Sequence, residues 1–415
     1  MKLKLDKQIN YIDNNNFKTI QIKVLFHFKE KLEELALSTL LPNLINFMNN
    51  DYLSEDSFKR AKLDKYILGI NCSKQCIGLE STISYNLVIP DIDTIGEDLL
   101  EEQIQFFSSF IYNPLIKDNC FDNFELEREK ENLRTFIDNS YKNIRPYQSI
   151  RLRELIDDQG ILSMDIATNR ELIDKVNAKN LYDFFKKVVI NNSCIVFVMG
   201  NTNHKKITSL LNKYIIKNKF INEFSVNYNN FLKPRDKVNI VNEKSQFKDS
   251  SLSIVYKIKN MSEKDKTVMA MVYGLLSSLS SRLLSKKLRD EGELVYSTRA
   301  IPYSHYGCFE ITAYINKDNK DLVYEKILEV IEELKNENVD DLLEKLKERK
   351  RISIKKNLDD KFFILNDYVS NVLGIEEEEE VIYKEMLKVT SKDISKFVKR
   401  FVLDTVYFIE EENND

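Results

Sequence analysis

The 415-residue sequence contains very little histidine and glycine. Its nine glycines form neither a G-x-G-x-x-G nor a Walker-type loop, which argues against the common glycine-rich nucleotide-binding motifs. The three histidines, His27, His204 and His305, lie far apart in the sequence, and we interpret each as a structural or surface residue rather than a metal ligand. These shortages favour a chain that binds no cofactor of its own.

Long apolar runs and a basic excess are also missing. No run approaches the roughly 20 apolar residues that cross a bilayer, and Met1 to Asp6 carry charges where a signal peptide would be apolar. The net charge of −4 argues against nucleic acid as the main partner, because phosphate binding needs a clear basic excess. We therefore expect a cytoplasmic protein that binds neither membranes nor nucleic acid.

The cysteines are few, scattered and odd in number. Five cysteines in a large chain without a secretion signal are most simply reduced thiols. Cys72 and Cys76 form a C-x-x-x-C pair with no second pair nearby, so a zinc knuckle is not expected. Cysteine therefore indicates neither a disulfide framework nor a metal site.

What the sequence does contain is an internal repeat. Residues 175–189, KVNAKNLYDFFKKVV, align without gaps with residues 388–402, KVTSKDISKFVKRFV. In each copy a helix-capping residue, Asn177 or Thr390, precedes apolar residues at helical spacing, and a strand-like run follows. The two copies lie 213 residues apart (388 − 175), so we predict that the chain consists of two similar halves.

The same order of elements is expected in both halves. Strands are predicted at 17–28, 80–89, 251–258 and 308–315, and helices follow at 32–48 and 265–279. Period-two strands and amphipathic helices in this order predict an α+β fold: two homologous α/β-sandwich domains, each a mostly antiparallel sheet with helices packed on one face. The polar stretch at 228–249 is interpreted as the linker, so we place the domains at residues 1–230 and 231–415.

Two motifs give this duplicated chain a resemblance to a known family. Ser280-Ser-Arg-Leu-Leu284 and the block from Lys287 to Ser297, KLRDEGELVYS, are similar to a signature of the insulinase-like zinc peptidases, S-S-R-L-F…L-R-E-x-x-x-L-x-Y-S. This family includes pitrilysin and mitochondrial processing peptidase. The helix from Phe124 to Glu131, FELEREKE, is similar to the family's acidic E-x-E-K helix. The resemblance covers nearly the whole chain.

The family's chemistry depends on a helical H-x-x-E-H, whose two histidines hold zinc together with a more distant glutamate, while the intervening glutamate is the general base. Here the corresponding helix reads LSTLLPNLI from Leu37 to Ile45, which places Thr39 and Asn43 at the histidines and Pro42 at the base. None of these three side chains suits its role. Glu129, 86 residues after Asn43 (129 − 43), matches the third ligand or is a salt-bridged surface residue. The resemblance thus implies a chain without its own zinc.

The substrate-binding pair of the second half is kept. In active members of the family, residues matching Arg289 and Tyr296 reach across from the second domain, and the tyrosine hydroxyl donates to the scissile or an adjacent carbonyl. A fixed donor stabilises the negative charge that attack builds on that oxygen, and arginine can fix the tyrosine or the peptide backbone. The alternative is that Arg289 pairs with Asp290 or Glu293 while Tyr296 only packs.

A chain with a lost metal helix and a kept Arg/Tyr pair resembles the supplementary subunit of those family members that divide the work between two chains. The resemblance implies a heterodimer with a zinc-bearing homologue, a peptide substrate bound between the chains, and hydrolysis, for peptide processing or maturation, only in the complex. In the family the peptide also adds as a strand to a sheet edge of the first domain, which we place at Glu80 to Ile89.

Two alternatives stay open. The first is a peptide-binding or scaffold homologue with no role in proteolysis, since core proteins of respiratory complexes resemble this fold. The second is an active peptidase whose metal site is built from Glu129 and distant histidines, which would require three scattered histidines to meet in the fold. The sequence does not specify the substrate peptide or the pathway.

Overall fold

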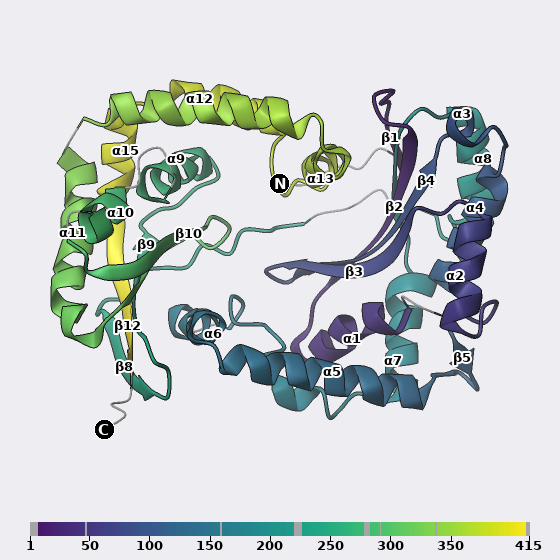
Figure 1. Cartoon of the computed structure of the whole chain (residues 1–415), viewed down its shortest axis with the longest axis horizontal. Coiled ribbons are helices and arrows are strands. Elements are labelled where there is room, and N and C mark those ends of the chain that lie inside the picture. Colours follow the sequence, from purple (N-terminus) through teal and green to yellow (C-terminus); the bar gives the residue numbers. More distant parts are fainter. Residues whose placement is uncertain are drawn as a thin grey trace. The chain divides into compact units, whose positions relative to one another are not determined.

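A computed structural model describes residues 7–45, 48–157, 160–219, 226–277, 283–290, 292–336 and 338–411. The chain divides into two compact units, and neither is a continuous stretch of sequence (Figure 1). Unit 1 contains Met1–Ile137, Met164–Tyr228 and Lys361–Glu376, and unit 2 contains Asp138–Ser163, Asn229–Asp360 and Glu377–Asp415. One segment from each half of the sequence therefore belongs to the unit built mainly by the other half.

Unit 1 is built on a five-stranded sheet with the order β1-β7-β2-β4-β3. The strands are β1 (Ile9–Ile12), β7 (Ile195–Met199), β2 (Thr19–Lys29), β4 (Glu80–Pro90) and β3 (Gly69–Ile77). β1 and β7 are parallel, and the other neighbours are antiparallel. The short strands β5 (Ile116–Lys117) and β6 (Cys120–Phe121) pair with each other. A two-residue turn joins β3 to β4, and Gly78 in it has a φ of 63°, the left-handed region that glycine enters without strain.

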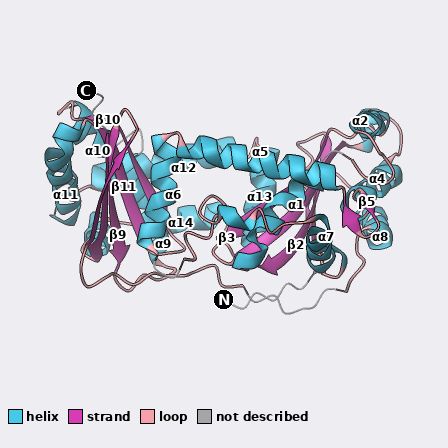
Figure 2. Cartoon of the chain, turned by 90° about the horizontal axis from the view of Figure 1, so that it is seen from below, coloured by secondary structure: helices cyan, strands magenta, loops and turns pink. Residues whose placement is uncertain are grey.

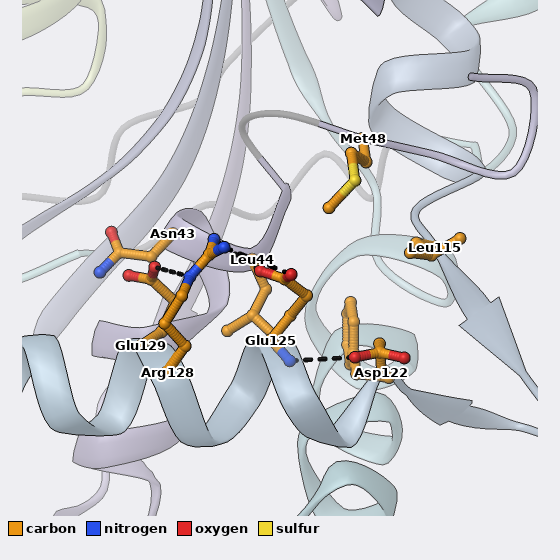
Figure 3. Close-up of a pocket in the computed structure, with 9 residues that line it drawn as sticks. Asn43, Leu44, Met48, Leu115, Asp122, Glu125, Arg128 and Glu129 are labelled. Atoms are coloured by element: carbon orange, nitrogen blue, oxygen red, sulfur yellow. Dashed lines mark hydrogen bonds and ion pairs between the residues drawn. The ribbon is translucent and has the colours of Figure 1, made fainter. Parts of the chain in front are cut away.

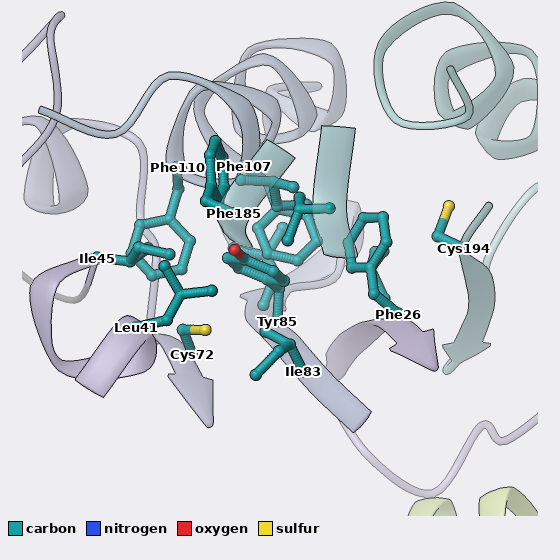
Figure 4. Close-up of a cluster of buried hydrophobic side chains, with 14 of the residues drawn as sticks. Phe26, Leu41, Ile45, Cys72, Ile83, Tyr85, Phe107, Phe110, Phe185 and Cys194 are labelled. Carbon is teal, nitrogen blue, oxygen red and sulfur yellow. The ribbon is translucent and has the colours of Figure 1, made fainter. Parts of the chain in front are cut away.

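Most helices of unit 1 pack on one face of this sheet. They are η1 (Leu32–Glu34), α1 (Leu35–Ile45), α2 (Glu55–Asp64), α3 (Ile92–Ile95), α4 (Leu100–Tyr112), α5 (Asn123–Tyr141), η2 (Arg170–Leu172), α7 (Ala178–Phe185), η3 (Lys186–Ile190) and α8 (His204–Tyr214). Phe107 and Phe110 of α4 point toward Tyr85 of β4 and Phe26 of β2, and all four rings are fully buried (Figure 4). Burying each such ring contributes about 1.5–3 kcal/mol, so this aromatic cluster holds the helices on the sheet.

Unit 2 repeats this plan with the strand order β8-β12-β9-β11-β10. The strands are β8 (Asn239–Ser245), β12 (Phe401–Glu411), β9 (Ser250–Ile258), β11 (Cys308–Ile315) and β10 (Val295–Tyr303). β12 and β8 are parallel, and the other neighbours are antiparallel. Figure 2 shows β9, β11 and β10 side by side. The parallel pair therefore stands at the same end of the strand order in both sheets.

One face of the second sheet is likewise covered by helices. They are α9 (Asp265–Ser277), α10 (Leu283–Ser285), η4 (Lys286–Asp290), η5 (Lys317–Asn319), α11 (Lys320–Asn336), α12 (Asp340–Asn357), α14 (Glu379–Lys388) and α15 (Ser391–Val398). Apolar side chains of α9, α11 and α15, including Leu275, Ile327 and Phe397, pack with Ile254 and Ile311 of the sheet. This core is separate from that of unit 1.

Each sheet carries one further helix on its opposite face. In unit 1 this helix is α13 (Lys361–Val372), whose Leu365 and Val369 pack with Leu25 and Phe197. In unit 2 it is α6 (Ile144–Ile156), whose Leu152 packs with a second apolar cluster. These are the two segments that belong to the unit of the other half. Because they cover the second face, the central strands are buried on both sides, as the continuous burial of β9 shows.

The predicted fold class is confirmed: two similar α/β units, each with a mostly antiparallel sheet. The predicted cap residues are also confirmed, since the side chains of Asn177 and Thr390 accept hydrogen bonds from the backbone of α7 and α15. The second layer, formed by α6 and α13, was not predicted, because nothing local marks a helix that packs on a distant part of the chain. The division at 230/231 stays a prediction for the folding domains.

The predicted edge strand was wrong. β4, which contains residues 80–89, lies between β2 and β3, and the edge of the sheet is β3 (Gly69–Ile77). β4 pairs with its hairpin partner β3 on one side and with β2 on the other. The alternating pattern of a strand shows which residues face the core, but it does not show on how many sides the strand has a neighbour. None of the helices in the described part of the chain is long and apolar enough to cross a bilayer.

Candidate functional site

α1 carries the residues that match the family's metal-binding motif, and a buried ionic cluster ties it to the sheet. Glu30, directly after β2, is only 3% exposed. Its carboxylate pairs with Lys74 Nζ of β3 at 2.6 Å and accepts a hydrogen bond from the Ser38 hydroxyl of α1 at 3.0 Å. Because a buried charge is tolerated only when it is paired and hydrogen-bonded, this cluster holds α1 in one place against the strand.

The three metal-motif positions of α1 offer no zinc ligand. The Thr39 hydroxyl donates to the Leu35 carbonyl at 2.7 Å, within the helix. Pro42 is buried inside the helix and has no backbone N–H for the carbonyl of Ser38. Asn43 is exposed, and its amide is a weak ligand for zinc beside histidine or carboxylate.

Asn43 and Glu129 line one small pocket of about 20 Å³, which has room for about one water molecule (Figure 3). The remaining described residues that line it are Leu44, Met48, Leu115, Phe121, Asp122, Glu125 and Arg128. Thr39 and Pro42 are not among these lining residues. The fold thus brings the second histidine position and the third-ligand position together, although 86 residues separate them (129 − 43).

Arg128 occupies this pocket with its charge already paired. One guanidinium nitrogen lies 2.5 Å from a carboxylate oxygen of Glu125, and another lies 3.6 Å from Glu129 (Figure 3). Asn132 also donates to Glu129 at 3.0 Å. The carboxylates that a metal ion would need are therefore neutralised by a cation from the same helix. The residues present do not fit zinc, and within the described ranges no three His, Cys, Asp or Glu side chains form a group that could hold a metal ion.

The histidines have other partners. A ring nitrogen of His27 lies 2.8 Å from Glu80, and one of His204 lies 2.7 Å from Asp13. A ring nitrogen of His305 lies 3.1 Å from Lys266 Nζ. Burial, and secondarily the positive charge of Lys266, lowers the pKa of His305 to about 4. His305 is therefore neutral near pH 7, and its Nδ1 accepts a hydrogen bond from the Lys266 ammonium.

Arg289 and Tyr296, the predicted substrate-binding pair, are both exposed. Arg289 is the second-to-last residue of η4, and no ion pair to Asp290 or Glu293 forms among the described residues. Tyr296 is the second residue of β10, an edge strand, and is 59% exposed. The interpretation in which these side chains only pair locally and pack is therefore not supported. Ser280 to Arg282 of the same signature lie outside the described residues.

A β-bulge sets Tyr296 apart from the residues around it. Val295 pairs with Ile315 and Ser297 pairs with Tyr314, so Tyr296 is an extra residue without a partner opposite. Val295 is buried in the core, while Tyr296 turns to solvent. A bulge re-aims a side chain and is common next to functional sites. Its presence could not be predicted from the sequence, because it depends on the register with β11.

The residues after Tyr296 fix the strand that carries it. Arg299 donates to buried Glu310 at 3.0 Å and to Gln148 Oε1 of α6 at 2.8 Å. The Ser297 hydroxyl accepts a hydrogen bond from Arg145 of α6 at 3.0 Å. The sequence carried no signal for this network, because its members come from distant segments that only the fold brings together.

The comparisons with known proteins agree with the fold. The family model described as "Peptidase M16 inactive domain" matches residues 175–350. A Bacillus subtilis protein named "Probable inactive metalloprotease YmfF" is 18% identical over 404 residues, 96% of this chain and 94% of that protein. Two solved structures share the fold. The structure of a conserved protein from Enterococcus faecalis aligns with a TM-score of 0.86 and 19% sequence identity, over 100% of this chain and 99% of that one. The structure of a Helicobacter pylori protease aligns with a TM-score of 0.76 and 14% sequence identity, over 99% of each chain.

Proposed function

Because the chain is a non-catalytic, insulinase-like (M16-type) peptidase homologue, we propose that it is the zinc-less subunit of a two-chain peptidase. A zinc-bearing homologue contributes the H-x-x-E-H helix, and Arg289 and Tyr296 of this chain contact the carbonyl of a peptide bound between the two chains. Hydrolysis, in peptide processing or maturation, requires both chains. A cytoplasmic location is part of this proposal and is tested by fractionating cells.

One contrast within the chain carries the proposal. Arg128 pairs with Glu125 and Glu129 in the pocket at the metal position, so this chain offers no free ligand set there. Arg289 and Tyr296 are exposed, and no hydrogen bond or ion pair of either side chain occurs within the described part of the chain. The exposed donors of Arg289 on η4 and Tyr296 on β10 are available to a substrate, whereas the paired carboxylates are not.

The chemistry asked of Tyr296 is that of a hydrogen-bond donor. When water attacks a peptide carbonyl, its oxygen gains negative charge, and a preorganised hydroxyl stabilises that charge. Removing one such donor costs about 2.7–4 kcal/mol in well-studied cases, which corresponds to about 10²–10³ in rate. The Arg289 guanidinium, with five donors in a rigid fork, orients the tyrosine or the peptide backbone.

The test mixes the purified chain with its zinc-bearing partner and measures peptide turnover. Alone, the chain should hydrolyse no peptide and bind no stoichiometric zinc. In the mixture, Tyr296→Phe should lower kcat by at least about tenfold, or about 1.4 kcal/mol of transition-state stabilisation, with a smaller effect on substrate binding.

Tyr273→Phe is the matched control, because Tyr273 is also an exposed tyrosine of unit 2 (41%) but lies on α9 and outside the Arg/Tyr motif. Its turnover should equal that of the unchanged chain. Equal turnover of the Tyr296 and Tyr273 variants would remove the catalytic role of Tyr296. Stable binding to a partner without any peptide hydrolysis would favour the scaffold alternative.

A further inference from the structure

A cavity of about 150 Å³ lies in unit 1, between helix α13 and the polar part of the sheet face that this helix covers. Val369 of α13 and Leu373, which directly follows this helix, form an apolar wall. Lys23 of β2 and Thr82 of β4 line it from the sheet. A cavity of about this volume admits a molecule the size of benzene, so it is large enough for a small organic ligand.

Lys23 brings a buried positive charge to this cavity. The side chain is only 5% exposed, and its Nζ donates to the Asn366 amide oxygen of α13 at 2.8 Å. Among the described residues, no carboxylate lies within ion-pair distance of it. Burial lowers the pKa of Lys23, since the charged form loses its hydration. The Asn366 amide accepts a hydrogen bond but carries no net charge, so it compensates the buried Lys23 charge only in part. A buried charge without a counter-ion is costly.

The other buried lysines show what is missing here. Lys130, Lys257 and Lys347 are between 3% and 8% exposed, as buried as Lys23. Each has a carboxylate partner: Glu127 at 2.8 Å, Asp404 at 3.2 Å and Glu344 at 2.8 Å. Lys23 is thus the buried lysine that, among the described residues, faces a cavity instead of a counter-ion.

The other titratable groups of the cavity do not neutralise Lys23. Glu80 lines it as well, but its carboxylate lies 2.8 Å from the His27 ring nitrogen. Cys76 also lines it; the residue is exposed, but partial desolvation of its thiol raises the thiol pKa, so the group is uncharged near pH 7. Among the described residues the Lys23 ammonium therefore has no ion-pair partner, while the Glu80 carboxylate is hydrogen-bonded to His27.

We propose that this cavity binds the carboxylate of a small apolar acid, with the Lys23 ammonium as its counter-charge and the apolar wall of Val369 and Leu373 around its hydrocarbon part. The Thr82 hydroxyl is a further donor to the carboxylate. A single unpaired positive charge beside an apolar wall fits a monovalent acid of roughly six to twelve non-hydrogen atoms. A phosphate dianion fits poorly, because it needs several donors and has no apolar part.

This chemistry occurs in a free short-chain acid and in the C-terminal residue of a peptide. The site is distinct from Arg289 and Tyr296, so the proposal does not depend on the proposed peptidase role. Titration calorimetry of the full chain should use 4-methylpentanoate, N-acetyl-leucine, the amide of each, and inorganic phosphate. Both acids should bind at least about tenfold more tightly than their amides, and phosphate should not bind.

Lys23→Met removes the charge, shortens the unbranched side chain by only one atom, and should abolish the preference for acid over amide. Lys29→Met is the matched control: it removes the same charge from the same strand, but Lys29 is exposed and should leave the preference unchanged. If 4-methylpentanoate alone binds, the ligand is a free acid; if N-acetyl-leucine binds more tightly, it is a peptide terminus. No binding of either acid up to about 10 mM, or an unchanged preference in Lys23→Met, would overturn the proposal.

A second measurement does not depend on ligand affinity. Because the pKa of Lys23 is lower in the folded chain than its ordinary 10.5, the unfolded chain holds more protons between the two values. The free energy of unfolding should therefore rise with pH toward 10.5 in the unchanged chain, relative to Lys23→Met. A saturating acid should remove this rise, since it holds the proton on Lys23. A rise that persists with bound acid would place the acid elsewhere.

Discussion

At the scale of single residues, Arg128 separates this pocket from a metal site. Thr39 and Asn43 stand where the motif has its two histidine ligands, but the carboxylates of Glu125 and Glu129 alone would still attract a cation. The Arg128 guanidinium lies on both carboxylates and takes the place of that external charge. Glu125 and Arg128 were not singled out from the sequence, because in so charged a helix nothing local distinguishes the carboxylates that face α1 from those that face solvent.

We predict that restoring the motif is not sufficient to restore zinc binding. The variant Thr39→His, Pro42→Glu, Asn43→His should bind zinc weakly, because Arg128 competes for Glu129 and repels the ion. Adding Arg128→Leu should tighten zinc binding by at least about tenfold, or about 1.4 kcal/mol. A zinc-chelator competition assay measures the affinity.

Arg134→Leu in the same background is the control for this prediction. It removes the same charge from α5, but Arg134 pairs with Asp174 and Glu131 and does not line the pocket. It should change zinc affinity little. If the Arg128 and Arg134 variants bind zinc equally, Arg128 does not block the site.

At the scale of elements, the two copies of the repeat begin in the same way. Asn177 and Thr390 each accept a hydrogen bond from the third backbone N–H of their helix, and Asn180 and Asp393 bond back to the cap. The apolar stripes of α7 and α15 then pack into the cores of units 1 and 2. These starts were predictable because capping involves only neighbours in the sequence.

Thr390→Ala should lower the free energy of unfolding by about 1 kcal/mol, since it leaves an N–H of α15 without its acceptor. Lys392→Ala is the control, because Lys392 lies in the first turn of the same helix but is exposed. It should change the free energy of unfolding by less than about 0.5 kcal/mol. Urea denaturation of the full chain measures both values. A Thr390 variant as stable as the Lys392 variant would show that this cap contributes nothing.

The β10 edge illustrates the opposite case among the elements. Two features decide where Tyr296 points: the bulge against β11, and the contacts of Ser297 and Arg299 with α6. Both depend on segments more than ten residues away in the chain, so the period-two pattern of the strand could not reveal them. The sequence signature identified Tyr296, but the direction of its side chain depends on the register between β10 and β11.

At the scale of the whole molecule, the exchange of α6 and α13 makes each half of the sequence incomplete. A chain cut at 230/231 would leave α6 with the first half and α13 with the second, although each belongs to the unit of the other half. The sheet of unit 1 would then lose the side chains that cover Leu25 and Phe197. The predicted domain boundary therefore separates sequence repeats but not packed units.

We predict that residues 1–230 and 231–415, expressed separately, are unstable. Each should bind the dye ANS and aggregate, because one apolar sheet face stays uncovered. Co-expressed, the two fragments should co-purify and unfold cooperatively. If each fragment alone is monomeric, unfolds cooperatively and binds no dye, the exchanged helices are dispensable.

The sequence alone determined the features that depend on neighbouring residues or on a motif. These are the helix starts, the strand periodicity, the duplication, the loss of zinc ligands at Thr39, Pro42 and Asn43, and the presence of Arg289 and Tyr296. Helix and strand periods follow from local backbone geometry, and a missing ligand is visible wherever the residue lies.

Only the tertiary structure decided the rest. It showed that β3, not β4, is the sheet edge, that Arg128 sits between two carboxylates, and that Lys23 faces a cavity without a counter-ion. Each of these depends on which distant segments meet, because burial, register and charge pairing are properties of neighbours in space. No local pattern records them.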